Sequence, residues 1–276
     1  MTQLQFGYYP GCALHGSSCD YEQSLRAVLD VLGVKLEELN DWICCGASAA
    51  HALNHKLGVA LPARNLAIAE RDGVTELFAP CPMCSMELLK ARDAIMSDET
   101  LRDEMSQTVE LPLTGKVVIR NLIEVFMQIG QKPLSAKITK PQTTLKPVCY
   151  YGCLLTRPSK VVKFDDPEHP TTMEELCRLC GAEPLDWNAR TMCCGAGLTM
   201  ADADTVKTLS GRIISEAVRV GANCVIVACP MCHMNLDLNA ASSLQVLYLS
   251  DLIGLAIGLT ASQLGINRHF SKVEAK

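Results

Sequence analysis

Ten cysteines recur in two copies of one pattern, and they are the residues of this chain best suited to carry chemistry. Each copy has a first cysteine, an adjacent Cys-Cys pair followed by glycine, and a Cys-x-x-Cys pair. Thiolates are ligands for zinc and for iron-sulfur clusters. Five thiols at a fixed spacing, present twice, predict two multi-ligand sites. The first copy is Cys12, Cys44, Cys45, Cys81 and Cys84, and the second is Cys153, Cys193, Cys194, Cys229 and Cys232.

The two copies keep nearly the same internal spacing. The offset between them is 149 residues at the Cys-Cys pairs (193 − 44) and 148 at both cysteines of the Cys-x-x-Cys pairs (229 − 81 and 232 − 84). At the first cysteine the offset is 141 (153 − 12), so the insertions fall between the first cysteine and the Cys-Cys pair. We expect the part of the spacing that both copies keep to be a structural requirement of the site.

Composition places the chain among ordinary globular proteins. It has 276 residues, a hydrophobic fraction of 49% and a net charge of −5, with scattered basic residues, which argues against nucleic-acid binding. No apolar run reaches the roughly 18 residues of a transmembrane segment, and the N-terminus lacks the pattern of a secretion signal. We therefore expect a cytoplasmic protein. Because disulfides are rare in that compartment, its fifteen cysteines favour metal or redox chemistry.

Short strands are predicted to lead into the thiol segments. Residues 4–9 have the pattern of a strand that ends before Cys12, and residues 75–79 have that of a strand followed by Cys81 and a helix. Gly46 allows the sharp turn that two adjacent thiols need if both are to face one site. Strand, turn and helix in this order predict an α/β fold with the sites at the carboxyl ends of the strands.

The repeat also predicts where the chain divides. We expect an N-terminal domain over residues 1–130, a linker over 131–147 and a C-terminal domain over 148–276. The linker assignment rests on four lysines among three prolines within this stretch.

Several kinds of site compete for the ten cysteines. Zinc takes four ligands and would leave one thiol of each copy unused. The tight Cys-x-x-Cys-x-x-Cys-x-x-x-Cys run of cubane ferredoxins is absent. Buried apolar cysteines would not explain the repeat. An iron-sulfur site of less usual build, using all five thiolates, fits the count best.

The five-cysteine pattern, present twice, resembles the paired CCG domains found in the B subunit of heterodisulfide reductase, including its bacterial sulfur-oxidation type. The resemblance extends over most of the chain and includes residues 163–170 and 255–260. It implies two tandem, pseudo-symmetric Rossmann-like halves, each holding one noncubane [4Fe-4S] cluster on its five cysteines. It also implies two partners in the same complex, one a flavin-bearing protein and the other a ferredoxin-like protein.

The same resemblance implies reversible disulfide and thiol redox chemistry in a catalytic subunit. The substrate would be a small disulfide or sulfur on a lipoate-bearing carrier protein, placed between two clusters that share the two electrons. Two other functions remain open. CCG domains also occur as electron-transfer subunits of larger dehydrogenases, and a zinc-stabilised scaffold without redox chemistry would need no iron.

Two histidines are candidate catalytic residues. His15 follows the first cysteine and is expected to be able to donate a proton to a leaving thiolate, and His233 is expected to line the second site. The run from Cys229 to His233 also matches the pattern for c-type haem attachment, but Ser85 takes the place of His233 in the first copy. Five further cysteines lie outside the repeat and are predicted mainly to pack in the interior: Cys19, Cys149, Cys177, Cys180 and Cys224.

Overall fold

Two parallel β-sheets, one in each half of the sequence, organise the protein. The structure is a computed structural model that describes residues 3–240 and 244–271. The first sheet has the strand order β2-β1-β3-β4 and the second has the order β5-β6-β7. The strands are β1 (Gln5–Tyr8), β2 (Lys35–Glu38), β3 (Glu76–Phe78), β4 (Val118–Arg120), β5 (Pro147–Tyr150), β6 (Cys224–Val227) and β7 (Gln245–Tyr248).

Helices connect the strands in both halves, as parallel pairing requires. In the first half they are α1 (Gly11–His15), α2 (Cys19–Val31), α3 (Ala47–Leu53), α4 (His55–Arg71), α5 (Pro82–Ser97), α6 (Glu99–Val109), α7 (Leu122–Ile129) and α8 (Gln131–Ser135). In the second half they are α9 (Thr172–Leu179), α10 (Ala203–Arg219), α11 (Pro230–Asp237) and α12 (Leu249–Ala256), with the short 3-10 turns η1 (Ala196–Leu198) and η2 (Ile266–Arg268). The predicted tandem α/β fold is confirmed.

Strand register aligns the carboxyl ends at which the thiol segments begin. In the first sheet Tyr8 pairs with Phe78, and Phe78 pairs with Arg120. In the second, Tyr150 pairs with Val227, which pairs with Tyr248. The chain therefore leaves neighbouring strands at a common edge in each half, which brings segments distant in sequence together.

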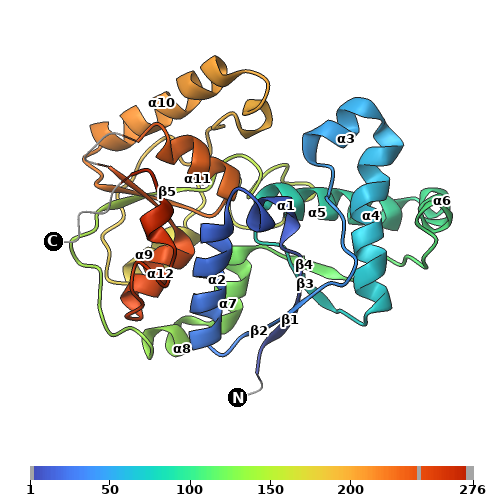
Figure 1. Ribbon diagram of the computed structural model, residues 1–276, viewed down its shortest axis with the longest axis horizontal. Coiled ribbons are helices and arrows are strands. Elements are labelled where there is room, and N and C mark those ends of the chain that lie inside the picture. Colours follow the sequence, from blue (N-terminus) through green and yellow to red (C-terminus); the bar gives the residue numbers. More distant parts are fainter. Residues whose placement is uncertain (1–2, 241–243, 272–276) are drawn as a thin grey trace.

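Packing between the halves is carried by α2 and α12, which lie side by side near the centre of the molecule (Figure 1). Ser24 of α2 donates a hydrogen bond to Asp251 of α12 at 2.5 Å and lies 2.9 Å from the hydroxyl of Ser250. The rings of Tyr21 and Tyr248 stack with centroids 4.3 Å apart. All of these side chains are buried. The helix that follows the Cys12 segment is thus part of the contact with the second half.

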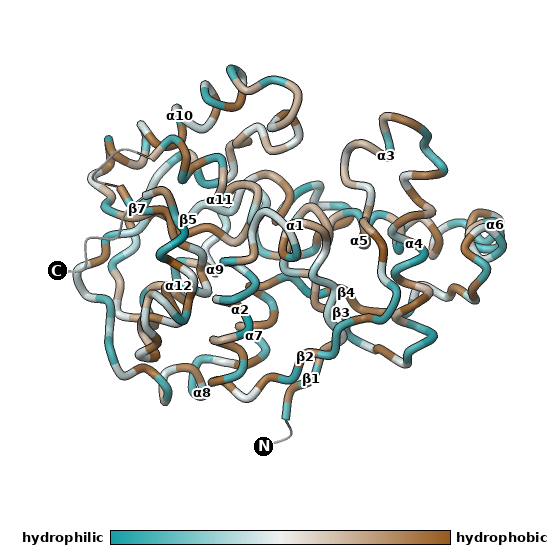
Figure 2. Tube along the Cα trace, in the orientation of Figure 1, coloured by the Kyte–Doolittle hydropathy of each residue, from teal (hydrophilic) through white to brown (hydrophobic). Residues whose placement is uncertain are grey.

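Hydrophobic residues concentrate in the inner strands and in the helices that cover them, whereas β2 at the edge of the first sheet and α6 at the periphery are mostly hydrophilic (Figure 2). The apolar stretch over residues 247–264 is not one continuous helix. It begins in β7, continues as α12 and ends in turns after Ala256. Tyr248 is extended at the start of α12, so the strand supplies the buried pairing and the helix starts at Leu249.

Candidate functional site

Three loops at the carboxyl edge of the first sheet bring five thiols together, here called the first site. Cys12 lies in α1 directly after β1, and Cys44 and Cys45 follow β2. Cys81 is the N-cap of α5 and Cys84 lies in its first turn, after β3. This is the arrangement that the strand, turn and helix pattern predicts.

Contacts between the thiols of the first site are continuous. The sulfur of Cys44 lies 3.9 Å from that of Cys12, and the sulfur of Cys45 lies 3.6 Å from that of Cys84. Cys44 also contacts Cys45, and Cys84 contacts Cys81. All five predicted residues are therefore in one group, in which every donor atom is a sulfur.

The second half repeats this geometry with its own five thiols, here called the second site. Cys153 follows β5, Cys193 and Cys194 precede η1, and Cys229 and Cys232 begin α11. The sulfurs of Cys153 and Cys193 are 4.0 Å apart, and those of Cys194 and Cys232 are 3.3 Å apart. Cys229 contacts Cys232 as Cys81 contacts Cys84.

A glycine turns each Cys-Cys segment. Gly46 and Gly195 have φ angles of 81° and 82°, in the left-handed region that glycine adopts without strain. Their backbone N–H groups point at the sulfurs of Cys44 at 3.5 Å and Cys193 at 3.4 Å. The predicted role of Gly46 agrees with this geometry, which places two adjacent thiols on one site.

A buried tyrosine anchors each Cys-Cys segment from the side of the first strand. The hydroxyl of Tyr9 donates to the carbonyl of Ile43 at 2.8 Å, and the hydroxyl of Tyr150 donates to the carbonyl of Met192 at 2.6 Å. Each carbonyl belongs to the residue that precedes the Cys-Cys pair. The same hydrogen bond therefore fixes the same segment in both sites.

Burial is graded across each site in the same way. Cys12 and Cys44 are exposed in the first site, and Cys193 is exposed and Cys153 half-buried in the second. The other six repeat cysteines are buried: Cys45, Cys81, Cys84, Cys194, Cys229 and Cys232. Each site thus has an inner face within the protein and an outer face that other molecules can reach.

The inner faces of the two sites meet. The thiols of Cys81 and Cys229 are neighbours: Cys229 is the largest influence that lowers the pKa of Cys81, and Cys81 in turn raises the pKa of Cys229, whose largest influence is Cys232. These two cysteines occupy the same position in the two copies of the repeat, separated by 148 residues (229 − 81). Sites that are far apart in sequence are therefore adjacent in space.

Electrostatics favour a thiolate in each group. Hydrogen bonds from the thiols of Cys44 and Cys84, with a further one from the backbone of Ala47, lower the pKa of Cys45 to about 3. The thiol of Cys232, with the backbone of Ala196, lowers the pKa of Cys194 to about 7. Since the thiolate is the form that binds metal, each site holds a ligand that ionises readily.

The donor set fits an iron-sulfur cluster. Soft sulfur ligands select iron-sulfur clusters, zinc or Cu(I), and no imidazole or carboxylate belongs to either group of five. A tetrahedral zinc ion takes four ligands, whereas five thiols lie together in each half. The residues present therefore suit a cluster that uses all five sulfurs.

The two candidate histidines have different surroundings. His15 is largely exposed, and its Nε2 lies 3.4 Å from a carboxylate oxygen of Glu38. Its ring also packs edge-on against Trp42, close to the first site. His233 is buried, its Nε2 lies 3.1 Å from the carbonyl oxygen of Val246, and its ring stacks on Tyr248.

Most cysteines outside the repeat lie in the interior, as the sequence suggests. Cys149, Cys177, Cys180 and Cys224 are buried, and the sulfurs of Cys149 and Cys177 are 3.6 Å apart. Cys19 is exposed, and its sulfur lies 3.1 Å from the guanidinium of Arg268. None of these five belongs to either group of repeat thiols.

Sequence reasoning missed two residues beside the second site. Asp20 and His269 meet His233 in a buried cluster, but they are 249 residues apart in the chain (269 − 20) and have no motif in common. The sequence contains no signal for these two residues, because the cluster forms only when α2 packs against the second half.

A cavity of about 260 Å³ lies between the halves near the thiol sites. Its walls come from α5, β4 and the segment after Cys153. They include Ser85, which follows Cys84, and Leu154, which follows Cys153. The side-chain Nε of Arg92, which also lines this cavity, is buried with no hydrogen-bond partner among the described residues.

Comparison with known families gives one match that covers most of each half. The family described as "Cysteine-rich domain" (CCG) matches residues 6–89 and 148–237. Each matched range includes one complete set of five repeat cysteines.

Similar proteins of known name match the chain over nearly its full length. It is 32% identical to the 8-methylmenaquinol:fumarate reductase membrane anchor subunit of Wolinella succinogenes, over 97% of both chains. It is 27% identical to the B subunit of a CoB-CoM heterodisulfide reductase of Methanosarcina acetivorans, over 95% of this chain and 92% of that protein. A similar protein from Methanosarcina mazei is 28% identical, over 94% of this chain and 91% of that protein.

One solved structure has the same fold. A crystal structure of a hypothetical protein from Helicobacter pylori superposes with a TM-score of 0.76 and 14% identity, over 99% of this chain. The present chain spans 53% of that protein. Within residues 3–240 and 244–271, none of the helices combines the length and the apolar character needed to span a membrane.

Proposed function

The chain belongs to the CCG cysteine-rich domain family, and from this premise we propose that it is the catalytic B subunit of a heterodisulfide reductase-like oxidoreductase. Both copies of the repeat match the family, which confirms the sequence-based assignment. The family supports iron-sulfur electron transfer as the general function. We propose two noncubane [4Fe-4S] clusters as the cofactors, held by Cys12, Cys44, Cys45, Cys81 and Cys84 and by Cys153, Cys193, Cys194, Cys229 and Cys232.

The contact between Cys81 and Cys229 is the observation that carries this proposal. Cleaving a disulfide requires two electrons, whereas an iron-sulfur cluster ordinarily passes one at a time. Two sites with adjoining inner faces allow both electrons to reach one substrate without a further carrier between them. Bound clusters would supply the electron chemistry, and the protein would supply their position.

The residues of this chain would exclude water from the clusters, give substrate access to them and deliver protons. The six buried thiols hold the inner faces away from water, and the exposed thiols, with the half-buried Cys153, form the faces that substrate or partner can approach. His15 lies beside the outer face of the first site and is the candidate to deliver a proton to a leaving thiolate. His233, which is buried directly after Cys232, is the candidate to line the second site from within the protein.

The proposed substrate is a small disulfide or sulfur carried on a lipoate-bearing protein. The relatives named as heterodisulfide reductase subunits imply a multi-subunit complex. We propose that its other members are a flavin-bearing protein and a ferredoxin-like protein, and that its compartment is the cytoplasm. A reducing compartment keeps unpaired thiols available for iron.

A second candidate function is electron transfer within a larger dehydrogenase or reductase. The relative with 32% identity over 97% of the chain is named as part of a methylmenaquinol:fumarate reductase, which favours this alternative. The two candidates share the cofactors and differ in where the two-electron chemistry takes place. In the first it occurs on this chain, and in the second on a partner.

The cofactors are tested by measuring iron, zinc and acid-labile sulfide after anaerobic purification. We expect about eight iron and about eight sulfide per chain, the content of two four-iron clusters. Half of that amount would contradict the two-cluster proposal. Zinc at the thiol sites without sulfide would contradict iron-sulfur chemistry altogether.

The two candidate functions are separated by mixing the chemically reduced, cluster-loaded chain with a small disulfide. Reoxidation of the clusters with release of two thiols per disulfide is expected if this chain performs the catalysis. Clusters that stay reduced with the disulfide, but are reoxidised by a quinone together with partner proteins, would favour electron transfer. Electron paramagnetic resonance follows the clusters in both experiments.

A further inference from the structure

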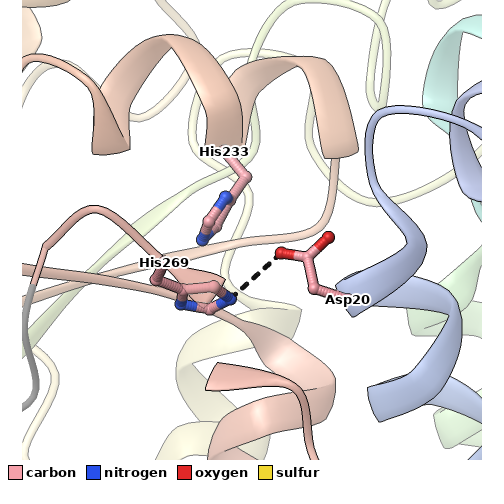
Figure 3. Close-up of side chains that lie close together, drawn as sticks. All are labelled: Asp20, His233 and His269. Atoms are coloured by element: carbon pink, nitrogen blue, oxygen red, sulfur yellow. Dashed lines mark ion pairs between the residues drawn. The ribbon is translucent and has the colours of Figure 1, made fainter. Parts of the chain in front are cut away.

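Three buried side chains meet outside the ten repeat thiols, where the two halves pack together. Asp20 begins α2, His233 lies in the first turns of α11, and His269 follows η2 near the end of the described chain (Figure 3). One nitrogen or oxygen atom from each lies within 4.8 Å of those from the other two. The cluster therefore draws one ligand-type group from the first half and two from the second.

His269 lacks the hydrogen bonds that a buried imidazole requires. Its side chain is fully buried, and neither Nδ1 nor Nε2 has a hydrogen-bond partner among the described residues. Leaving a buried polar group unpaired costs about 1–3 kcal/mol. The carboxylates of Asp20 and Asp251 lie 3.3 Å and 3.9 Å from Nε2, so negative charge already surrounds this ring.

His233 presents the tautomer that a metal ligand needs. Its Nε2 lies 3.1 Å from the carbonyl oxygen of Val246. Because a carbonyl can only accept, this contact places the ring proton on Nε2 and leaves the lone pair on Nδ1. A backbone carbonyl that fixes one ring nitrogen is the usual support of a metal-bound histidine.

Stacked aromatic rings lie beside this cluster. His233 stacks on Tyr248 with centroids 4.0 Å apart, and Tyr248 stacks on Tyr21 at 4.3 Å. Burial raises the pKa of both tyrosines, and the nearby thiol of Cys229 raises it further. The cluster is thus a distinct group of nitrogen and oxygen donors beside the second site.

We propose that Asp20, His233 and His269 bind one divalent transition metal ion, such as zinc. Two imidazoles and one carboxylate are a donor set that zinc accepts, with a fourth position left for another ligand. The ion would bind a ring nitrogen of His269 that has no hydrogen-bond partner among the described residues. Its positive charge would offset the negative charge of the neighbouring carboxylates. It would also join the start of α2 to α11 and to the segment after η2, across the boundary between the halves.

The test uses the anaerobically purified, cluster-loaded chain with Zn²⁺ as the probe. The protein is incubated with zinc, freed of loosely bound ion by gel filtration and assayed for zinc, iron and sulfide. We expect one tightly held zinc per chain. X-ray absorption at the zinc edge is expected to show a first shell of nitrogen and oxygen at about 2.0–2.1 Å and no sulfur.

Variants assign the ion to these residues. Asp20→Asn, which keeps the size of the side chain, and His269→Gln are expected to weaken zinc binding at least about tenfold and to leave iron and sulfide unchanged. The matched control is His169→Gln, because His169 is an exposed histidine distant in sequence from the cluster. It is expected to retain the zinc.

Thermal unfolding keeps the test decisive if one variant folds poorly. Zinc is expected to raise the melting temperature of the wild-type chain and of His169→Gln, but not that of Asp20→Asn, because a bound ion stabilises the folded state alone. Absence of zinc from the wild-type chain would overturn the proposal and leave His269 paired with Asp20 through a proton. Sulfur in the first shell, or zinc retained by His269→Gln, would also overturn it.

Discussion

The residue that follows each Cys-x-x-Cys pair has different surroundings in the two halves. Ser85 and His233 each follow the second cysteine of a Cys-x-x-Cys pair, 148 residues apart (233 − 85). Around Ser85 the halves leave a cavity lined in part by Arg92 and Lys160. His233 instead lies among Asp20, His269 and stacked tyrosines.

The difference shows which parts of the repeat are constrained. The thiols, the glycine after each Cys-Cys pair and the anchoring tyrosine are the same in both halves, with matching contacts. The residues that follow the Cys-x-x-Cys pairs, Ser85 and His233, differ between the halves, and so do their neighbours. Binding the two clusters would therefore constrain the thiols and the residues that hold the Cys-Cys segments in place, and each outer corner is available for a role of its own.

The largest expected effect, on iron content and turnover, comes from replacing one buried thiol, in either half. Cys81→Ser and Cys229→Ser should each lower the iron content by about half and abolish disulfide turnover, because both clusters are needed for two electrons. Iron analysis and a turnover assay check this. Cys180→Ser is the control, since that buried thiol lies outside both sites. Full turnover in either Cys81→Ser or Cys229→Ser would refute the hypothesis that both clusters are needed to reduce the disulfide.

Alanine at each of the two turn glycines should lower the stability of the protein by different amounts, because the two turns are packed differently. A methyl group at Gly46 would come within 2.6 Å of Ala50 and 2.8 Å of Leu61, whereas at Gly195 its nearest neighbour is Val206 at 3.2 Å. Both variants lose about 1–2 kcal/mol because φ is positive. Gly46→Ala should lose about 1–3 kcal/mol more through overpacking.

Urea unfolding of the two glycine variants measures this difference. A Gly195→Ala variant that is less stable than Gly46→Ala would contradict the packing argument. Equal losses would mean that the segment around α3 moves aside at little cost.

The anchoring tyrosines should show no difference between the halves. Tyr9→Phe and Tyr150→Phe each remove one hydrogen bond to the carbonyl before a Cys-Cys pair, at 2.8 Å and 2.6 Å. We expect each to lower the free energy of unfolding by about 1 kcal/mol. Denaturant titrations of both variants check the equality, and losses that differ by more than the hydrogen-bond energy itself would show that the two segments are held differently.

The smallest expected effect concerns a helix start in the first half. Asn121 accepts hydrogen bonds from the backbone N–H groups of Ile123 and Glu124, and Glu124 accepts one from the backbone of Asn121. Asn121→Ala should cost about 1 kcal/mol through loss of the cap of α7. Thermal unfolding measures it, with Gln128→Ala on the exposed side of the same helix as control. Iron content should not change.

The sequence predicts the thiol sites well because the repeat is local in each loop. Eight of the ten cysteines follow a strand, and parallel strands bring their carboxyl ends to one edge, so a coarse strand assignment is enough to bring these eight together. Cys193 and Cys194 follow no strand among the described residues. The contact of Cys81 with Cys229 is harder to foresee, since it depends on how the halves face each other. Spacing within a copy carries no information about that.

The cluster of Asp20, His233 and His269 lies beyond sequence reasoning for the same reason. Its members meet because α2 packs on α12 and the chain after η2 returns to this place. The division of residues 247–264 into β7 and α12 is similar, because an apolar run reads alike as a buried strand or a buried helix. The domain limits 1–130 and 148–276 remain a prediction; the linker proposed between them, 131–147, contains α8 and the first residue of β5.

The contact between Cys81 and Cys229 also has an evolutionary consequence. In a symmetric dimer, a residue that touches its own copy lies on the two-fold axis. Two separate copies of an ancestral half, associating through this surface, would have brought two identical clusters together with no linker at all. Fusion of the genes for two such copies would release each copy from identity with the other, so that one position could hold Ser85 in one half and His233 in the other.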